Sequence, residues 1–313
     1  MNFPPRATLV AVALALLAAF LWASYYPLVL GVHPADAPSG LLALPFLVGG
    51  LAFTAVAIGR GEAAELGRLW RDPAAWGRTG LLVTMQLAVL ASTYLTGAVD
   101  TSLLSLLGDV VVTPVLLVVL FSEGSERVRS WGFLGGIAAC TAGSALTIVV
   151  GGSAHPIGGW GVPLALGVPP LIALYFLGMA RACRTHPTSA VGGQATLAAG
   201  VVGLALTPLL PGGLGGVLPP SWGAALAAVA IGIAAFFLGP LCYFLAIERT
   251  GIVLPAVLMA TIPLFTLLFA WTVLGTVPPW LGLAGIPLAC AGAFVALRGE
   301  HDPWRPPGPS GPA

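Results

Sequence analysis

Ten apolar runs, each about long enough to cross a lipid bilayer as a helix, dominate the 313-residue sequence. A bilayer core takes about 20 consecutive apolar residues in helical form, and only helices and closed barrels can span it. Charged residues make up 7% of the chain, too few to cover a water-facing surface. We therefore expect an all-α integral membrane protein with ten transmembrane helices, at roughly 8–30, 39–59, 79–97, 101–121, 130–150, 161–181, 189–210, 222–247, 251–274 and 280–297.

The twelve basic residues, all of them arginines, support this number of helices, because cytoplasmic loops collect positive charge. With the N-terminus inside and the helices alternating, every arginine falls in a cytoplasmic loop or tail. A missing or extra helix would invert each later loop and scatter the arginines over both sides. The sequence thus predicts both termini in the cytoplasm, one extended hydrophilic connection at 60–78, and a bacterial inner-membrane location.

The two halves of the sequence match each other at an offset of 149 or 150 residues. Tyr94 aligns with Tyr243, and Pro114 aligns with Pro263. Each half holds five predicted helices, an odd number, so the second half would have the opposite orientation in the membrane. Inverted repeats are typical of alternating-access transporters. The predicted units are a first five-helix repeat at 1–150, a second at 151–298 and a disordered cytoplasmic tail at 299–313.

The segment 101–149 combines a proline in mid-helix, a glutamate at the following cytoplasmic end and a glycine-rich helix. These features are Pro114, Glu126, Gly135, Gly136 and Gly143. They resemble the EamA-type family of the drug/metabolite transporter (DMT) superfamily, as does the opening Leu21-Trp22-Ala23-Ser24. The sequence departs from that family where Gly275 replaces a second glutamate. The resemblance implies a transporter that exports amino acids or other small metabolites, often driven by a proton gradient.

Asp109 is the only acidic residue placed well inside a predicted span. An ionised carboxylate there costs about 2.5–3.5 kcal/mol on insertion scales, which makes such a residue a functional candidate. Ser105, Asp109 and Thr113 recur at four-residue steps, so they share one helix face. We expect this face to line a cavity for substrate or protons. The alternative is a neutral, buried aspartate that bonds to a neighbouring helix.

Aromatic and amide side chains in other spans predict a site for a small, partly apolar ligand. Each of them, taken singly, also fits ordinary packing between helices. Two prolines placed in mid-span are candidates for hinges, since they free backbone carbonyls. The binding candidates are Gln86, Tyr94, Gln194, Tyr25, Tyr175 and Tyr243, and the hinge candidates are Pro114 and Pro263.

The function predicted from these features is secondary transport, as an exporter of amino acids or similar metabolites coupled to protons through Asp109. One alternative is efflux of lipophilic cations or drugs with Asp109 as counter-ion, and another is a scaffold that transports nothing. The expected partners are a small-molecule substrate, the bilayer and protons, with the chain as monomer or homodimer. No spacing typical of a metal, cofactor or enzyme site occurs, and a net charge of +1 gives no reason to expect nucleic acid.

Overall fold

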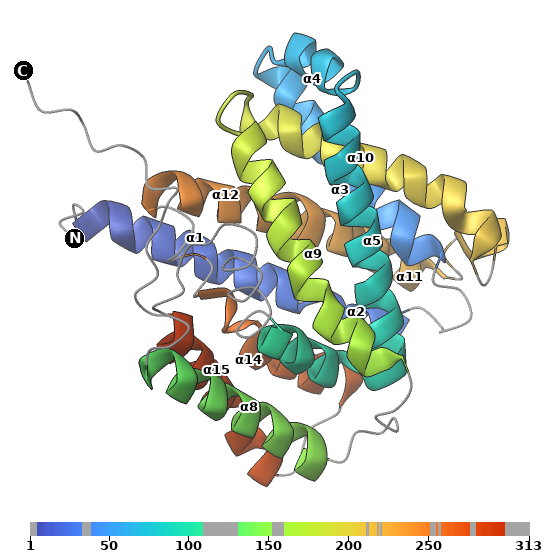
Figure 1. The fold of residues 1–313 in the computed structure, drawn as a ribbon. Helices are drawn as coiled ribbons and strands as arrows, with labels where there is room; N and C mark the ends of the chain where they lie inside the picture. The colour runs from blue at the N-terminus through green and yellow to red at the C-terminus, as the bar shows by residue number, and fades with distance from the viewer. Residues whose placement is uncertain are drawn as a thin grey trace, which may run out of the picture.

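The structure, a computed structural model, describes residues 5–32, 39–108, 131–151, 160–210, 213–217, 219, 221–250, 255, 258–275 and 280–297. Within these ranges every regular element is a helix and no β-strand occurs, as the sequence predicts. Figure 1 shows the helices packed as a bundle in which α1 crosses the pair α5 and α9 at a large angle.

The first half of the chain contains helices in every predicted span. In chain order they are α1 (Pro5–Ala23), α2 (Tyr25–Val32), α3 (Ser39–Gly59), α4 (Ala63–Leu69), α5 (Pro73–Thr96), a short helix Ala98–Gly108, and α8 (Trp131–Gly151). The interruption between α1 and α2 has a local cause. Pro27 has no N–H to donate to the carbonyl of Ala23, so the helix loses a hydrogen bond there.

Helix α5 begins at Pro73 rather than at residue 79, which corrects the predicted boundary. Asp72 caps this helix, because its side chain accepts a hydrogen bond from the Ala74 N–H at 2.9 Å. Proline is well suited to the first helical position, where its missing N–H costs nothing. The residues between 73 and 78 are therefore helical and do not belong to the hydrophilic connection.

The second half of the chain is also helical throughout the elements that the structure describes. Its elements are α9 (Gly161–Ala182), α10 (Thr188–Leu206), the 3₁₀ turns η1 (Thr207–Leu209) and η2 (Gly213–Val217), α11 (Trp222–Ile233), the π-turn η3 (Ala234–Leu238), α12 (Gly239–Thr250), α14 (Ile262–Phe269), the π-turn η4 (Ala270–Leu274) and α15 (Trp280–Leu297). Six helical segments of the described chain are long and apolar enough to cross a membrane. Ten spans remain a prediction.

The tryptophans at helix starts lie on the surface. Trp131, Trp222 and Trp280 open α8, α11 and α15, and Trp160 caps α9. Their side chains are between 77% and 89% exposed. Exposed indole rings at helix ends are what an interfacial aromatic belt requires.

Two pairs of described helices approach each other through glycines at equivalent positions of the two halves. In the pair α3 and α10, a Cβ added at Gly50 would lie 2.4 Å from the backbone N of Leu197. A Cβ added at Gly200 would lie 2.8 Å from the backbone N of Leu47. Gly200 and Leu197 are each 150 positions after Gly50 and Leu47, so one contact repeats the other with the two halves exchanged.

The pair α8 and α15 has the same property. A Cβ at Gly143 would lie 2.4 Å from the backbone N of Ala289, and one at Gly292 would lie 2.3 Å from the backbone N of Cys140. Here the equivalent positions are 149 residues apart. The helices of each pair also run antiparallel, since residue numbers rise along one helix as they fall along its partner.

The remaining major helix pairs are exchanged in the same way. Helix α1 packs along α12, and α5 packs along α9. At the offset found in the sequence, α1 corresponds to α9 and α5 corresponds to the segment α11–α12. Exchange of the two halves therefore converts one pair into the other.

Candidate functional site

A group of aromatic side chains fills the centre of the bundle, in the largest buried core of the described chain. Trp22 contacts both Phe176 and Tyr243, at ring-centroid distances of 5.7 and 5.3 Å. Tyr25 lies 5.7 Å from Phe236. We call this set the aromatic cluster; its members are Trp22, Tyr25, Tyr26, Tyr175, Phe176, Phe236, Tyr243 and Phe244. Both halves of the chain contribute to it.

A proline in the second half explains how Trp22 is held. Pro240 has no N–H, and the N–H of Gly239 bonds to Ala234 in the π-turn η3. The carbonyl of Ala235 is thereby left without its usual helical donor. The indole Nε1–H of Trp22 donates to this carbonyl at 2.8 Å. The carbonyl that the helix interruption frees in the second half thus accepts a hydrogen bond from a side chain of the first half.

Five of the binding residues predicted from the sequence meet at the aromatic cluster. The side-chain amide of Gln86 donates to the hydroxyl of Tyr25, and both groups are buried. Tyr94 packs against the same core. Tyr175 and Tyr243 each contact the ring of Phe176. The cluster therefore offers apolar walls with tyrosine hydroxyls and one amide, which suits a small ligand with both apolar and polar parts.

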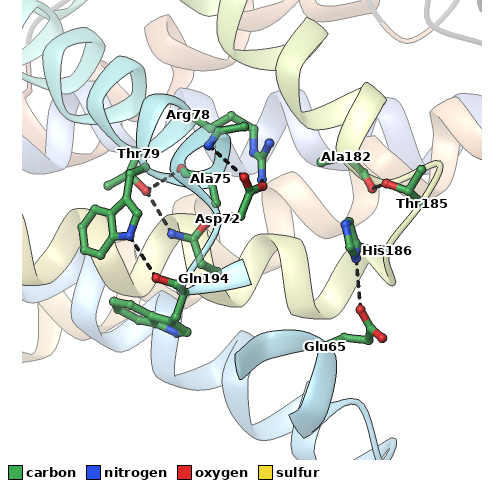
Figure 2. Close-up of polar contacts among 12 residues, drawn as sticks. Glu65, Asp72, Ala75, Arg78, Thr79, Ala182, Thr185, His186 and Gln194 are labelled. Atoms are coloured by element: carbon green, nitrogen blue, oxygen red, sulfur yellow. Dashed lines mark hydrogen bonds and ion pairs between the residues drawn. The ribbon is translucent and has the colours of Figure 1, made fainter. Parts of the chain in front are cut away.

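Gln194 lies apart from the aromatic rings, fully buried on α10. Its Nε2 donates to the hydroxyl of Thr79 on α5 at 3.4 Å, as Figure 2 shows. Its Oε1 has no hydrogen-bond partner among the described residues. A buried acceptor without a donor is unfavourable, so this amide is available to a ligand or water.

Arg78 is the residue that the sequence prediction missed. It was assigned to the hydrophilic connection, but it lies in the second turn of α5 with its side chain only 11% exposed. Its Nε and Nη2 have no hydrogen-bond partner among the described residues. The missed signal was the pair Asp72-Pro73, which marks a helix start and places residue 78 inside the helix.

Side chains from α4 and α12 hold the start of α10. Ser189 donates to Glu62, and His186 Nδ1 lies 3.1 Å from Glu65 Oε2. Thr188 donates to Glu248 at 3.1 Å. We call the two contacts with α4 the acidic clamp. They lie at the end of the bundle where α3, α9 and α12 finish, which we call the charged end. Figure 2 shows the contact between His186 and Glu65.

The remaining predicted residues lie elsewhere. Ser105 is buried in the helix Ala98–Gly108, and its hydroxyl has no partner among the described residues. Pro263 is buried in the first turn of α14 rather than in mid-helix. Asp109, Thr113 and Pro114 lie outside the described residues.

Asp100 is a buried carboxyl that sequence reasoning placed in a loop. It is 9% exposed and lies just before the predicted span 101–121. Burial raises the pKa of this carboxyl from 3.8 to about 6. A helix that begins at Ala98 brings Asp100 against the bundle. The sequence offered no clear sign of that early start, because Gly97 was an equally good signal for a turn.

Comparison with known proteins agrees with this architecture. A solved structure described only as "Crystal structure of protein" superimposes with a TM-score of 0.68 at 21% sequence identity. The alignment covers 91% of this chain and 96% of that one, and it supports the fold alone. No curated protein sequence matches the chain.

The family comparison matches the second half of the chain. The model of the EamA-like transporter family covers residues 159–298. The sequence motifs pointed to 101–149 and to its copy 149 residues later, and this copy lies within the matched residues. The resemblance itself is confirmed: residues 159–298 match the model of the EamA-like transporter family, a family of the DMT superfamily.

Proposed function

We propose that this protein is a secondary transporter of the DMT type that exports amino acids or similar small metabolites across a bacterial inner membrane. It crosses the membrane ten times as two inverted units, at 1–150 and 151–298, with both termini in the cytoplasm. The substrate binds between the two units at the aromatic cluster.

The mirrored glycine contacts are the observation that carries this proposal. Gly50–Leu197 and Leu47–Gly200 exchange under one sequence offset, which is expected if a two-fold axis passes between α3 and α10. The two helices run antiparallel, so the axis must be perpendicular to them. For helices that span a bilayer, such an axis lies in the membrane plane and relates two inverted units. This arrangement supports alternating access around a site on the axis.

The distribution of charge supports the orientation. Among side chains that the structure describes, all the charged ones other than Asp100 belong to the charged end. Their positions in the chain are 60, 62, 65, 68, 71, 72, 78, 181, 184, 248 and 249. Seven of these are arginines, and positive residues concentrate on the cytoplasmic side.

Flux measurement in proteoliposomes would test transport and separate its alternatives. The library should contain neutral amino acids, primary amines and lipophilic cationic dyes. Uptake of an amino acid supports the proposal, and uptake of dyes alone favours cation efflux. Folded protein that moves no compound would favour a scaffold.

Labelling tests the orientation independently. Cysteine introduced at Ser153 should react with an impermeant thiol reagent from outside in a chain whose native cysteines are replaced by alanine. Cysteine at Ala64, which is exposed beside the acidic clamp, should react only after the membrane is opened. The reverse pattern would contradict the orientation.

Proton coupling is proposed to depend on Asp109. A carboxyl in a low-dielectric cavity can bind a proton on one side of the membrane and release it on the other. Asp109→Asn keeps the shape but cannot titrate, so we expect it to abolish uphill transport in vesicles with an imposed pH gradient. Asp100→Asn is the control, because it removes a buried carboxyl outside the predicted span. Equal accumulation by Asp109→Asn and wild type would refute the role.

A further inference from the structure

We propose that Arg78 binds the carboxylate of the substrate, at the side of the aromatic cluster that faces the charged end. This inference rests on the proposed transport function and narrows its substrate class to amphipathic monocarboxylates. It also counts against lipophilic cations as substrates, because a fixed positive charge next to the site repels them.

The side chain of Arg78 is directed inward, toward α9. A Cβ added at Gly178 would lie 3.2 Å from Arg78 Cγ and 3.4 Å from Cδ, so the aliphatic stem packs where α9 has no side chain. Pro73 starts the helix five positions earlier, which places Arg78 about 7.5 Å along α5 at 1.5 Å per residue. The guanidinium is thus held within the bundle and not on its rim.

The guanidinium has a loose ion pair with Asp72, but its Nε and Nη2 have no hydrogen-bond partner among the described residues. Asp72 Oδ2 lies 3.9 Å from Nη2, which is outside hydrogen-bond distance. Asp72 is also engaged through Oδ1 as the cap of α5. Arginine presents its N–H groups as a planar fork that matches a carboxylate, and buried charges are normally paired. An incoming anion would supply the acceptor that the fold does not.

The surroundings select the kind of anion. Tyr175, a member of the aromatic cluster, precedes Gly178 by three residues on α9, so it lies about one turn from the position where the stem of Arg78 packs. A ligand with its carboxylate on Arg78 can therefore lay its apolar part against the aromatic rings. Asp72 leaves little net positive charge for a dianion, which favours a singly charged carboxylate over phosphate.

Binding of matched probes to the purified, full-length protein tests the proposal. The probes are 3-phenylpropionate, phenethylamine and inorganic phosphate, and the readout is the rise of the thermal unfolding midpoint in detergent at constant ionic strength. We expect a saturable rise with 3-phenylpropionate only. In Arg78→Gln the apparent Kd should weaken about 10- to 100-fold, as for loss of a hydrogen bond to a charged group.

Two further variants test whether the effect depends on the guanidinium of Arg78 or on positive charge in general. Arg78→Lys keeps the charge without the planar fork and should bind with intermediate affinity. Arg68→Gln removes an arginine that is 73% exposed at the same end, and should leave binding unchanged. Equal midpoint rises in wild type and Arg78→Gln, or no rise with 3-phenylpropionate, would overturn the assignment. So would a rise produced by phosphatidylglycerol alone, since Arg78 would then bind lipid.

Transport by the same variants separates this inference from the proposed function. If wild-type protein moves phenethylamine as well as phenylalanine and Arg78→Gln does the same, transport stands and the role of Arg78 fails. If no compound moves while the Arg78-dependent midpoint rise persists, the carboxylate site stands and transport fails.

Discussion

The crossing of α3 with α10 and the crossing of α8 with α15 use the same contact in different surroundings. Both bring backbone against backbone through glycines that are exchanged between the two halves. The α3–α10 crossing is enclosed, with Phe46 and Phe53 fully buried beside it and the acidic clamp at its charged end. The α8–α15 crossing joins the rest of the described bundle mainly through α14 and a small apolar core.

This difference indicates a division of roles. Displacement at α3–α10 must disturb α5, α11 and the clamp together, because all of them pack on these two helices. Displacement at α8–α15 disturbs fewer of the described helices, because α14 is the main one that packs on this pair. Substitution of a contact glycine should therefore be tolerated far better at the α8–α15 crossing than at the α3–α10 crossing.

The largest expected effect is that of Gly50→Ala. The new methyl would meet the backbone N of Leu197 at 2.4 Å, and neither helix can retreat within its enclosed surroundings. We expect a loss of stability at the upper end of the usual 1–3 kcal/mol for overpacking, with loss of transport. Thermal unfolding in detergent measures the first, and Gly80→Ala on α5, where nothing lies within 4 Å, is the matched control.

Gly143→Ala should cost less, although its clash with Ala289 N is equally short at 2.4 Å. Few of the described helices restrain α8 and α15, so we expect about 1 kcal/mol and retained flux. Gly135→Ala on the same helix meets no atom within 4 Å and should be neutral or slightly stabilising. Unfolding midpoints that fall equally for Gly50→Ala and Gly143→Ala would remove the distinction between the two crossings.

Removal of one contact of the acidic clamp should have a smaller effect. Ser189→Ala takes away the hydrogen bond to Glu62, for an expected loss of about 0.5–1.5 kcal/mol. Hydrogen exchange of the first turn of α10 should accelerate, while exchange in α15 stays unchanged. Faster exchange in both helices would show that the two crossings are not independent.

Thr147→Val should have the smallest effect. The Thr147 hydroxyl donates to the Gly282 carbonyl across α8 and α15 at 2.8 Å. Such bonds between membrane helices average about 0.6 kcal/mol. Valine keeps the shape, so a small fall of the unfolding midpoint is expected. A loss of stability larger than that of Gly143→Ala would mean that this hydrogen bond, and not close packing, holds α8 against α15.

The helical fold could be predicted well because it depends on patterns within single segments. Apolar length located the long described helices, but it missed α4 and the start of α5. The position of Arg78 could not be predicted from apolar length, because it depended on where α5 begins. The hydrogen bond from Trp22 to Ala235 could not be predicted either, since it requires a proline in one half to face an indole from the other.

The acidic clamp has consequences for the populations of the two forms that alternating access requires. In perfectly equivalent halves the inward-facing and outward-facing forms would have equal free energy and equal occupancy. The positions 150 residues after Glu62 and Glu65 are Gly212 and Gly215, which carry no acid. Two hydrogen bonds of about 1 kcal/mol each would favour the form closed at the charged end by roughly 30-fold. The substrate-free protein would then mainly adopt the form that is open on the opposite side. Ser189→Ala should shift the equilibrium between the two forms measurably in labelling experiments.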